Sequence, residues 1–200
     1  KYFISFMVIV PIFFLLMMQP DIGQTLLIFL SWLTLVFISG ISLTIFLTVF
    51  TVSIFILFYL IFFVDKFGYI KNRVFSFFDP NTGTHNFQSE KAIEAISSGG
   101  FFGKGIGEGT LKNRVPEAHT DYIVSVISEE FGIVFIILLL FIFLFLIYTV
   151  FKRIYLEKDE KVKLILTGLI TLIISQALIH LGVNIRLFPT TGMTLPYLSY

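Results

Sequence analysis

A cluster of ionisable residues stands where a long apolar stretch begins, within RVPEAHTDYIVSVISEEFG at residues 114–132. Its acidic residues and histidine are Glu117, His119, Asp121, Glu129 and Glu130. An isolated Asp121 would be interpreted as a helix N-cap, because a carboxylate there complements the helix dipole. Glu129 and Glu130 lie about two turns into the helix, where no cap needs them, and ionisable groups near membrane depth usually face a polar cavity. The pattern therefore predicts a functional site at the mouth of a membrane helix.

The histidines give only weak support to a metal site. His119 could bind a metal ion, but the chain contains only His85 and His180 besides, and no cysteine. An ordinary hydrogen bond from a loop histidine is therefore favoured, and no metal site is predicted. His180 shares one helical face with Gln176 and Asn184. That polar stripe indicates hydrogen bonding between helices or, alternatively, the lining of a cavity.

The composition is that of a membrane protein. Hydrophobic residues make up 56% of the 200 positions, aromatic residues 18%, and the mean hydropathy is +0.94, which leaves too little polar surface for a soluble domain. A net charge of +1 without a dense basic patch gives nucleic-acid binding no support. The absence of cysteine excludes disulfides and thiolate catalysis. The chain begins at Lys1 without a methionine and ends at Tyr200 inside an apolar pattern, so we expect a fragment of a longer protein. We expect no signal peptide at its start.

Runs without charge define the elements that must position the cluster. No charged residue lies between Asp21 and Asp65. That block is too long for one helix of about 20 residues, so it predicts two spans, broken at Ser39–Ser42. The expected spans are 2–18, 22–38, 43–64, 131–151 and 164–185, with the start of a sixth near Leu195. The predicted fold class is therefore an all-α polytopic helical membrane protein, forming a single domain with one long extracytoplasmic loop.

The turn at 152–163 sets the expected orientation. It carries five basic residues in twelve positions, and short loops rich in Lys and Arg stay on the cytoplasmic side. Counting spans backwards places the loop 65–121 and the turn around Gln19 outside. A loop of that length within a helical membrane domain is usually functional.

Glycines divide the outer loop. Ser89 is expected to cap a short helix that ends at Gly99 and Gly100. From 103 to 109 every second residue is glycine, in a spacing that fits neither the P-loop nor the dinucleotide fingerprint. A flexible turn is the favoured interpretation. The alternative is a nest of backbone amides for phosphate oxygens, with Lys104 adding positive charge.

Four segments together resemble the SEDS family of bacterial shape, elongation, division and sporulation proteins, which includes RodA, FtsW and SpoVE. They occur in the family's order and are QPDIGQTLL (19–27), QSEKAIEAISSGGFFGKGIGEGT (88–110), PEAHTDYIVSVISEEFG (116–132) and NIRLFPTTGMTLPYLSY (184–200). The resemblance covers nearly the whole chain, and PEAHTD and GMTLP are more similar to the division branch, FtsW. The family's ten spans imply a fragment from the fifth span to the start of the tenth.

The resemblance implies a peptidoglycan glycosyltransferase that polymerises lipid II. Asp121 matches the aspartate of the family's HTDF motif and is implied to be the catalytic residue. A carboxylate there can take the proton of an acceptor sugar hydroxyl as a general base, while undecaprenyl diphosphate leaves. The leaving diphosphate needs cationic stabilisation, for which the candidates are Lys104, Arg114 and Arg186. Matching motif positions give the further substrate-binding candidates Glu117, His119, Gln19, Asp21, Ser98, Gly99 and Gly100.

The resemblance also implies partners and a location. The partners are lipid II, a class B penicillin-binding protein that acts as transpeptidase, and other proteins of the divisome. The location is the bacterial inner membrane at the division septum. No cofactor is indicated, and a requirement for a divalent cation such as Mg²⁺ is left open.

Two departures from the family pattern bear on the site. Asn113 stands where FtsW proteins often carry glutamate, and Thr191 stands where lysine is common. Arg186, where many relatives have a small residue, is hypothesised to replace the lost charge. Two alternative functions stay open, a lipid II flippase or transporter and a non-catalytic scaffold that recruits the transpeptidase. Only an enzyme should lose its function with Asp121→Asn.

Overall fold

The computed structural model describes residues 2–19, 21–78, 84–110, 118 and 120–199, and in this part of the chain it contains helices and no strand. Five apolar helices form the body of the protein: α1 (Tyr2–Met18), α2 (Ile22–Ile38), α3 (Leu43–Phe63), α6 (Ile123–Leu156) and α7 (Glu160–Asn184). The predicted all-α class is therefore confirmed.

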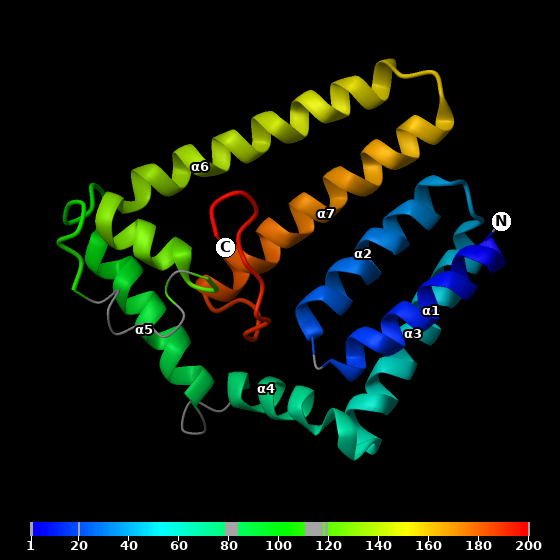
Figure 1. Ribbon diagram of the computed structural model, residues 1–200, viewed down its shortest axis with the longest axis horizontal. Helices are drawn as coiled ribbons and strands as arrows, with labels where there is room; N and C mark the ends of the chain where they lie inside the picture. Colours follow the sequence, from blue (N-terminus) through cyan, green and yellow to red (C-terminus); the bar gives the residue numbers. More distant parts are fainter. Residues whose placement is uncertain (1, 20, 79–83, 111–117, 119, 200) are drawn as a thin grey trace.

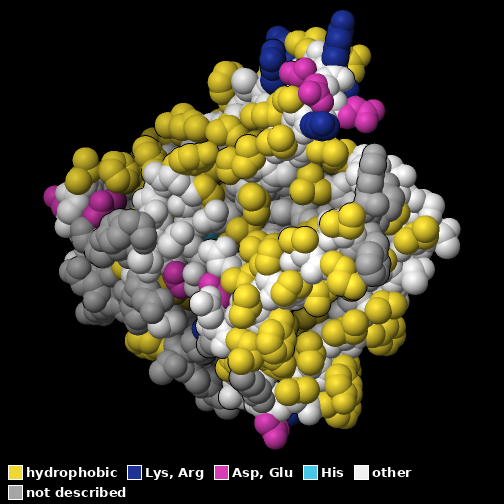
Figure 2. Space-filling model, turned by 45° about the vertical axis from the view of Figure 1, so that its right-hand side comes forward, with side chains coloured by type: hydrophobic (Ala, Val, Ile, Leu, Met, Phe, Trp, Pro, Cys, Tyr) yellow, Lys and Arg dark blue, Asp and Glu magenta, His cyan; other side chains and the backbone are white. Residues whose placement is uncertain are grey.

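Three of these helices are long and apolar enough to cross a membrane, namely α3, α6 and α7. The helices α1 and α2 are equally apolar in character but have 17 residues each. No residue of α3 is buried within the protein, and a helix that is hydrophobic on all sides must be covered by an apolar medium. Figure 2 shows the same property as a broad hydrophobic surface, with charges of both signs gathered over the α6–α7 turn. The protein is a multi-pass membrane protein.

The turns divide between two ends of the molecule (Figure 1). The α2–α3 and α6–α7 turns lie toward one end, and the α1–α2 turn, α4, α5 and the C-terminal segment lie toward the other. This is the alternation that the charge-based orientation requires. Which end is cytoplasmic stays a prediction that rests on the basic residues of 152–163.

The predicted outer loop 65–121 is largely helical where the structure describes it. A short 3-10 helix (Asp65–Phe67) leads into α4 (Gly68–Phe78), and α5 covers Thr84–Gly99. The expected cap at Ser89 is wrong, because α5 starts at Thr84 and leaves Ser89 buried inside the helix. The predicted end at Gly99 is confirmed.

The helix α6 differs from the predicted span 131–151. It begins at Ile123, and it is broken at Gly132, whose φ of 77° and ψ of −179° are not helical. The break separates a short first half from the long membrane helix that follows, and Figure 1 shows the two halves turning sharply at this point. The apolar run in the sequence predicted only the part of α6 that follows the break.

A hydrophobic core lies beneath the start of α6. It joins α2, α5, α6, α7 and the C-terminal segment through Leu27, Ala92, Ala95, Ala118, Tyr122, Val126, Ile179, Val183 and Met193. Ala92 and Ala95 are completely buried, and their small side chains let α5 approach α6 closely. The residue before Tyr122 is Asp121, so the core directly supports the backbone that carries this carboxylate.

Candidate active site

Asp121 stands two residues before the first residue of α6 and is half-buried. The N-cap position itself belongs to Tyr122, and no side-chain cap bond is formed there. The interpretation of Asp121 as the helix N-cap is therefore wrong. Tyr122 is only 1% exposed, so the chain enters the core right after Asp121 and the position of Asp121 is set by packing.

Asn184, the last residue of α7, holds the backbone around Asp121. Its Nδ2 donates to the carbonyl oxygen of Asp121 at 3.0 Å, and its Oδ1 accepts from the amide of Ser125 at 3.3 Å. The expectation that the Gln176–His180–Asn184 stripe bonds between helices is confirmed at Asn184, because Ser125 belongs to α6.

The segment after α7, residues 185–199, folds back toward Asp121 and is called the returning segment. It turns at once, with the amide of Leu187 donating to the carbonyl of Gly182 at 2.7 Å. Further along, a Cβ atom at Gly192 would lie 3.9 Å from Asp121 Oδ2. Gln176 Nε2 donates to the carbonyl of Thr194 at 2.9 Å, which ties the returning segment to α7. Ser199 Oγ donates to the carbonyl of Thr120 at 2.9 Å. The returning segment is therefore attached to α7 and to the residue before Asp121.

The same segment contacts the start of α2. Any side chain at Gly23 would overlap Met193 and would come within 2.7 Å of the carbonyl oxygen of Thr191. Asp21 caps α2, and its Oδ1 accepts from the amide of Gln24 at 2.9 Å. Gln19 is exposed in the preceding turn. The structure thus places the first and last of the four motif segments side by side, with a capping role visible for Asp21.

The glycine-rich loop, residues 100–109, forms backbone hydrogen bonds on both sides of the break in α6. The amides of Lys104 and Gly105 donate to the carbonyls of Glu129 and Glu130 at 2.9 and 3.0 Å. The carbonyls of Gly100 and Phe101 accept from the amides of Ile133 and Val134 at 3.0 and 3.3 Å. A break in a membrane helix leaves backbone groups without intrahelical partners, and the loop supplies partners on both sides.

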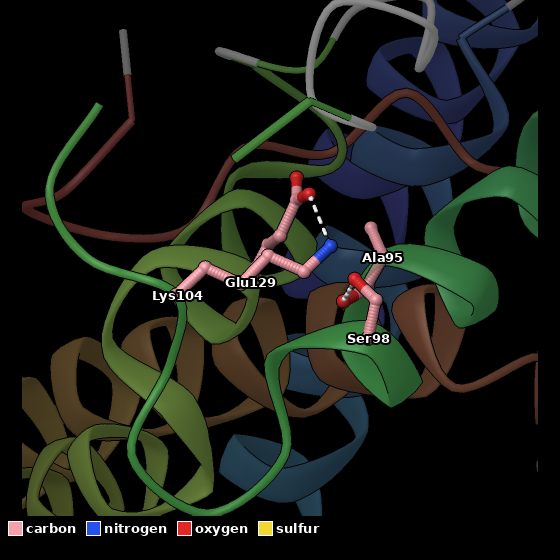
Figure 3. Close-up of polar contacts among 4 residues, drawn as sticks. All are labelled: Ala95, Ser98, Lys104 and Glu129. Atoms are coloured by element: carbon pink, nitrogen blue, oxygen red, sulfur yellow. Dashed lines mark hydrogen bonds and ion pairs between the residues drawn. The ribbon is translucent and has the colours of Figure 1, made fainter. Parts of the chain in front are cut away.

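Side chains reinforce this attachment. Lys104 Nζ lies 3.3 Å from Glu129 Oε1, and the Glu129 side chain is fully buried. Figure 3 shows the two groups meeting close to the last turn of α5, where Ser98 donates to the carbonyl of Ala95. The amide of Gly107 donates to Glu130 Oε1 at 3.2 Å. Because the amides of 104, 105 and 107 bind acidic residues of this chain or their carbonyls, the loop is an anchored element and the phosphate-nest interpretation is not supported.

The family model described as cell cycle protein, covering FtsW, RodA and SpoVE, matches residues 1–200. The chain belongs to this family. Among its relatives are proteins described as probable peptidoglycan glycosyltransferase FtsW. That of Caulobacter vibrioides is 37% identical over 93% of this chain and 47% of its own length, and that of Trichlorobacter lovleyi is 34% identical over 99% and 52%.

A solved structure shares the fold of this family member. It is described as "Structural coordination of polymerization and crosslinking by a peptidoglycan synthase complex", and it matches with a TM-score of 0.75 at 24% identity over 98% of this chain and 55% of the other. The chain spans about half the length of the curated relatives it matches.

The remaining candidate residues of the FtsW/RodA/SpoVE pattern lie in different places. Arg186 has a φ of 58°, and its Nη1 lies 3.6 Å from Glu90 Oε1 of α5. Gly99 packs against the backbone of Ser128, where any side chain would overlap it. The candidates that fall outside the described residues are Arg114, Glu117 and His119.

The sequence analysis did not predict one cation of this region. Arg73 of α4 donates through Nη1 to the carbonyl of Thr190 at 3.2 Å. Its only signal in the sequence is a single charge in an amphipathic segment, which does not indicate a partner more than a hundred residues away. No three His, Asp or Glu side chains in the described ranges lie close enough together to hold a metal ion, and a divalent-cation requirement stays a prediction.

Proposed function

We propose that the protein is a peptidoglycan glycosyltransferase that polymerises lipid II in the bacterial cytoplasmic membrane, with Asp121 as the general base. The observation that carries the proposal is the placement of Asp121 at the mouth of α6. Its backbone is bound by Asn184, and its carboxylate lies beside the returning segment at Gly192. The description of the relatives as probable peptidoglycan glycosyltransferases supports the reaction class.

The chemistry asked of Asp121 is a single proton transfer. The acceptor sugar hydroxyl attacks the anomeric carbon of the donor, and the bond from that carbon to the diphosphate oxygen breaks. Asp121 takes the hydroxyl proton, and the undecaprenyl diphosphate carries the electron pair of the broken bond away. General base catalysis of this kind contributes about 10²- to 10⁴-fold to a rate. One displacement of this type inverts the anomeric centre.

Of the two candidates Lys104 and Arg186, Arg186 is the better placed to stabilise the leaving diphosphate. Lys104 already faces the fully buried carboxylate of Glu129, and moving it toward a phosphate would weaken the stabilisation of that buried charge. Arg186 faces Glu90, whose side chain is 52% exposed. Because an exposed ion pair is weak, the guanidinium can exchange that partner for a phosphate oxygen at little cost.

The location and partners follow from the same proposal. The polyprenyl tail of lipid II stays in the bilayer while its sugars meet Asp121 at the outer surface. The solved structure with the same fold concerns a complex that coordinates polymerisation and crosslinking. We therefore include a class B penicillin-binding protein as the partner and the division septum as the site of action.

The test uses the full-length protein with its penicillin-binding partner and labelled lipid II. We expect Asp121→Asn to lower the polymerisation rate at least 100-fold, because the amide cannot accept the proton. Asp159→Asn is the matched control, since Asp159 is an exposed aspartate that caps α7 at the opposite end of the molecule.

The alternatives give different results in the same assay. A scaffold would allow Asp121→Asn to support as much polymer as the wild type. A flippase would move lipid II across the bilayer and form no polymer with either protein. Either result would refute the enzymatic proposal.

A further inference from the structure

Asn184 makes an unusual set of contacts for a membrane helix terminus. The residue is 0% exposed. Its Nδ2 donates to Asp121 O at 3.0 Å and to His180 O at 2.9 Å, and its Oδ1 accepts from Ser125 N at 3.3 Å. One amide thus joins the end of α7 to the start of α6.

One of these contacts corresponds to that of a helix N-cap. The bond to the carbonyl of His180 stays within α7, one turn before Asn184. The amide of Ser125 lies three residues after the N-cap position, and it is the group that a capping Asp or Ser side chain normally binds. At the start of α6 no side chain of the cap position does this. Ser125 N also reaches the carbonyl of Tyr122 at 3.0 Å, so its hydrogen is shared between that oxygen and Asn184.

The orientation of the amide is determined by its neighbours. The group that faces Asp121 O and His180 O must be a donor, and the group that faces Ser125 N must be an acceptor. His180 Nδ1 lies 3.3 Å from the same Nδ2. Only an amide in this orientation places a donor at the two carbonyls and an acceptor at the amide of Ser125, which makes the site selective for asparagine.

We propose that Asn184 caps α6 from a different helix and is thereby a positioning residue for Asp121. It touches the backbone of Asp121 and not its carboxylate, so it acts on the reaction through the placement of that residue. The inference rests on the proposed function of Asp121, and it adds the element that holds the base in place. A misplacement of about 1 Å can cost about 100-fold in rate.

Two substitutions separate positioning from general destabilisation. Asn184→Asp keeps the shape and the acceptor for Ser125 N but puts an oxygen opposite Asp121 O, where the two lone pairs repel. Asn184→Ala removes the bond to Asp121 O and the bond from Ser125 N. With the full-length protein, its partner and labelled lipid II, we expect each variant to lower kcat about 30- to 100-fold and to change KM less than about threefold. Thr149→Val, which removes an exposed hydroxyl bonded within α6, should keep wild-type kinetics.

A spectroscopic measurement tests the placement without any turnover. This chain contains no cysteine, so Asp121→Cys, in full-length protein without other cysteines, carries a single nitroxide spin label. We expect the label to move faster when Asn184→Ala or Asn184→Asp is added, and to be unchanged when Thr149→Val is added. If Asn184→Ala does not fold, the isosteric Asn184→Asp still gives the comparison.

The outcomes distinguish this inference from the proposed function. Unchanged label motion in the Asn184 variants, or wild-type kcat in both of them, would overturn the positioning role. Full activity of Asp121→Asn together with a mobilised label would overturn the proposed function and leave the cap between helices supported. Lower kcat, nearly constant KM and a mobilised label would support both.

Discussion

Lys104 of the glycine-rich loop and Glu129, three residues before the break in α6, form an ion pair with the carboxylate fully buried and the ammonium partly exposed. The pair lies where the backbone of the glycine-rich loop binds both ends of the break. Charge and backbone contacts therefore hold one loop against the helix whose first residues follow Asp121.

Removing the cation of this pair should destabilise the protein. Lys104→Met removes a cation from beside the buried carboxylate of Glu129, and we expect the free energy of unfolding to fall by about 2 kcal/mol. Unfolding of the full-length protein in detergent micelles measures the change. The double variant Lys104→Met/Glu129→Met should recover part of the loss, because no buried charge then remains. A single Lys104→Met variant as stable as the wild type would contradict the pairing.

Gly132→Ala should loosen the glycine-rich loop. The residue has a φ of 77°, and an added Cβ would overlap the carbonyl of Phe101. We expect the alanine backbone at this positive φ to cost about 1–3 kcal/mol, in addition to the overlap. Because both effects weaken the contact between the loop and α6, hydrogen exchange at the amides of Lys104 and Gly105 should be faster. Gly40→Ala is the control, because Gly40 has a φ of 83° and no neighbouring atoms within 4 Å. Equal exchange at the loop amides in both variants would show that the overlap is unimportant.

Arg186→Ala should abolish polymerisation while expression stays normal. The expectation follows from the proposed contact of the guanidinium with the diphosphate. Glu90→Gln tests the alternative that Arg186 serves only its ion pair with α5, since it removes the partner and keeps the cation. We expect Glu90→Gln to retain activity in the labelled lipid II assay. Equal loss in the two variants would assign Arg186 to the ion pair, and a fully active Arg186→Ala would exclude any role in polymerisation.

Asp21 has a capping role in the structure and a substrate-binding role by family resemblance, and two variants separate them. Asp21→Ala removes the cap and should cost about 1 kcal/mol of stability. Asp21→Ser keeps a capping oxygen and removes the charge. We expect Asp21→Ser to retain stability, measured by unfolding in micelles, and to raise KM for lipid II. An unchanged KM would leave Asp21 with the cap alone.

Local patterns in the sequence determined the class of the protein and most of its helices. The apolar runs at 2–18 and 22–38 coincide with α1 and α2, and the small residues at Ser39–Ser42 mark the turn before α3. Such patterns suffice because helix hydrogen bonds join residues four apart, and the need to bury apolar side chains in lipid acts on each segment by itself.

The tertiary structure decided the site. The break at Gly132 was not predictable, because a single glycine is tolerated in a helical pattern. The backbone that approaches it, at Phe101 and Gly103, lies about thirty residues earlier in the chain. The bonds from Asn184 to Asp121 and from Arg73 to Thr190 join residues far apart in the chain. The sequence put polar residues at these positions, but which donor meets which acceptor depends on how the helices pack, and no local periodicity encodes it.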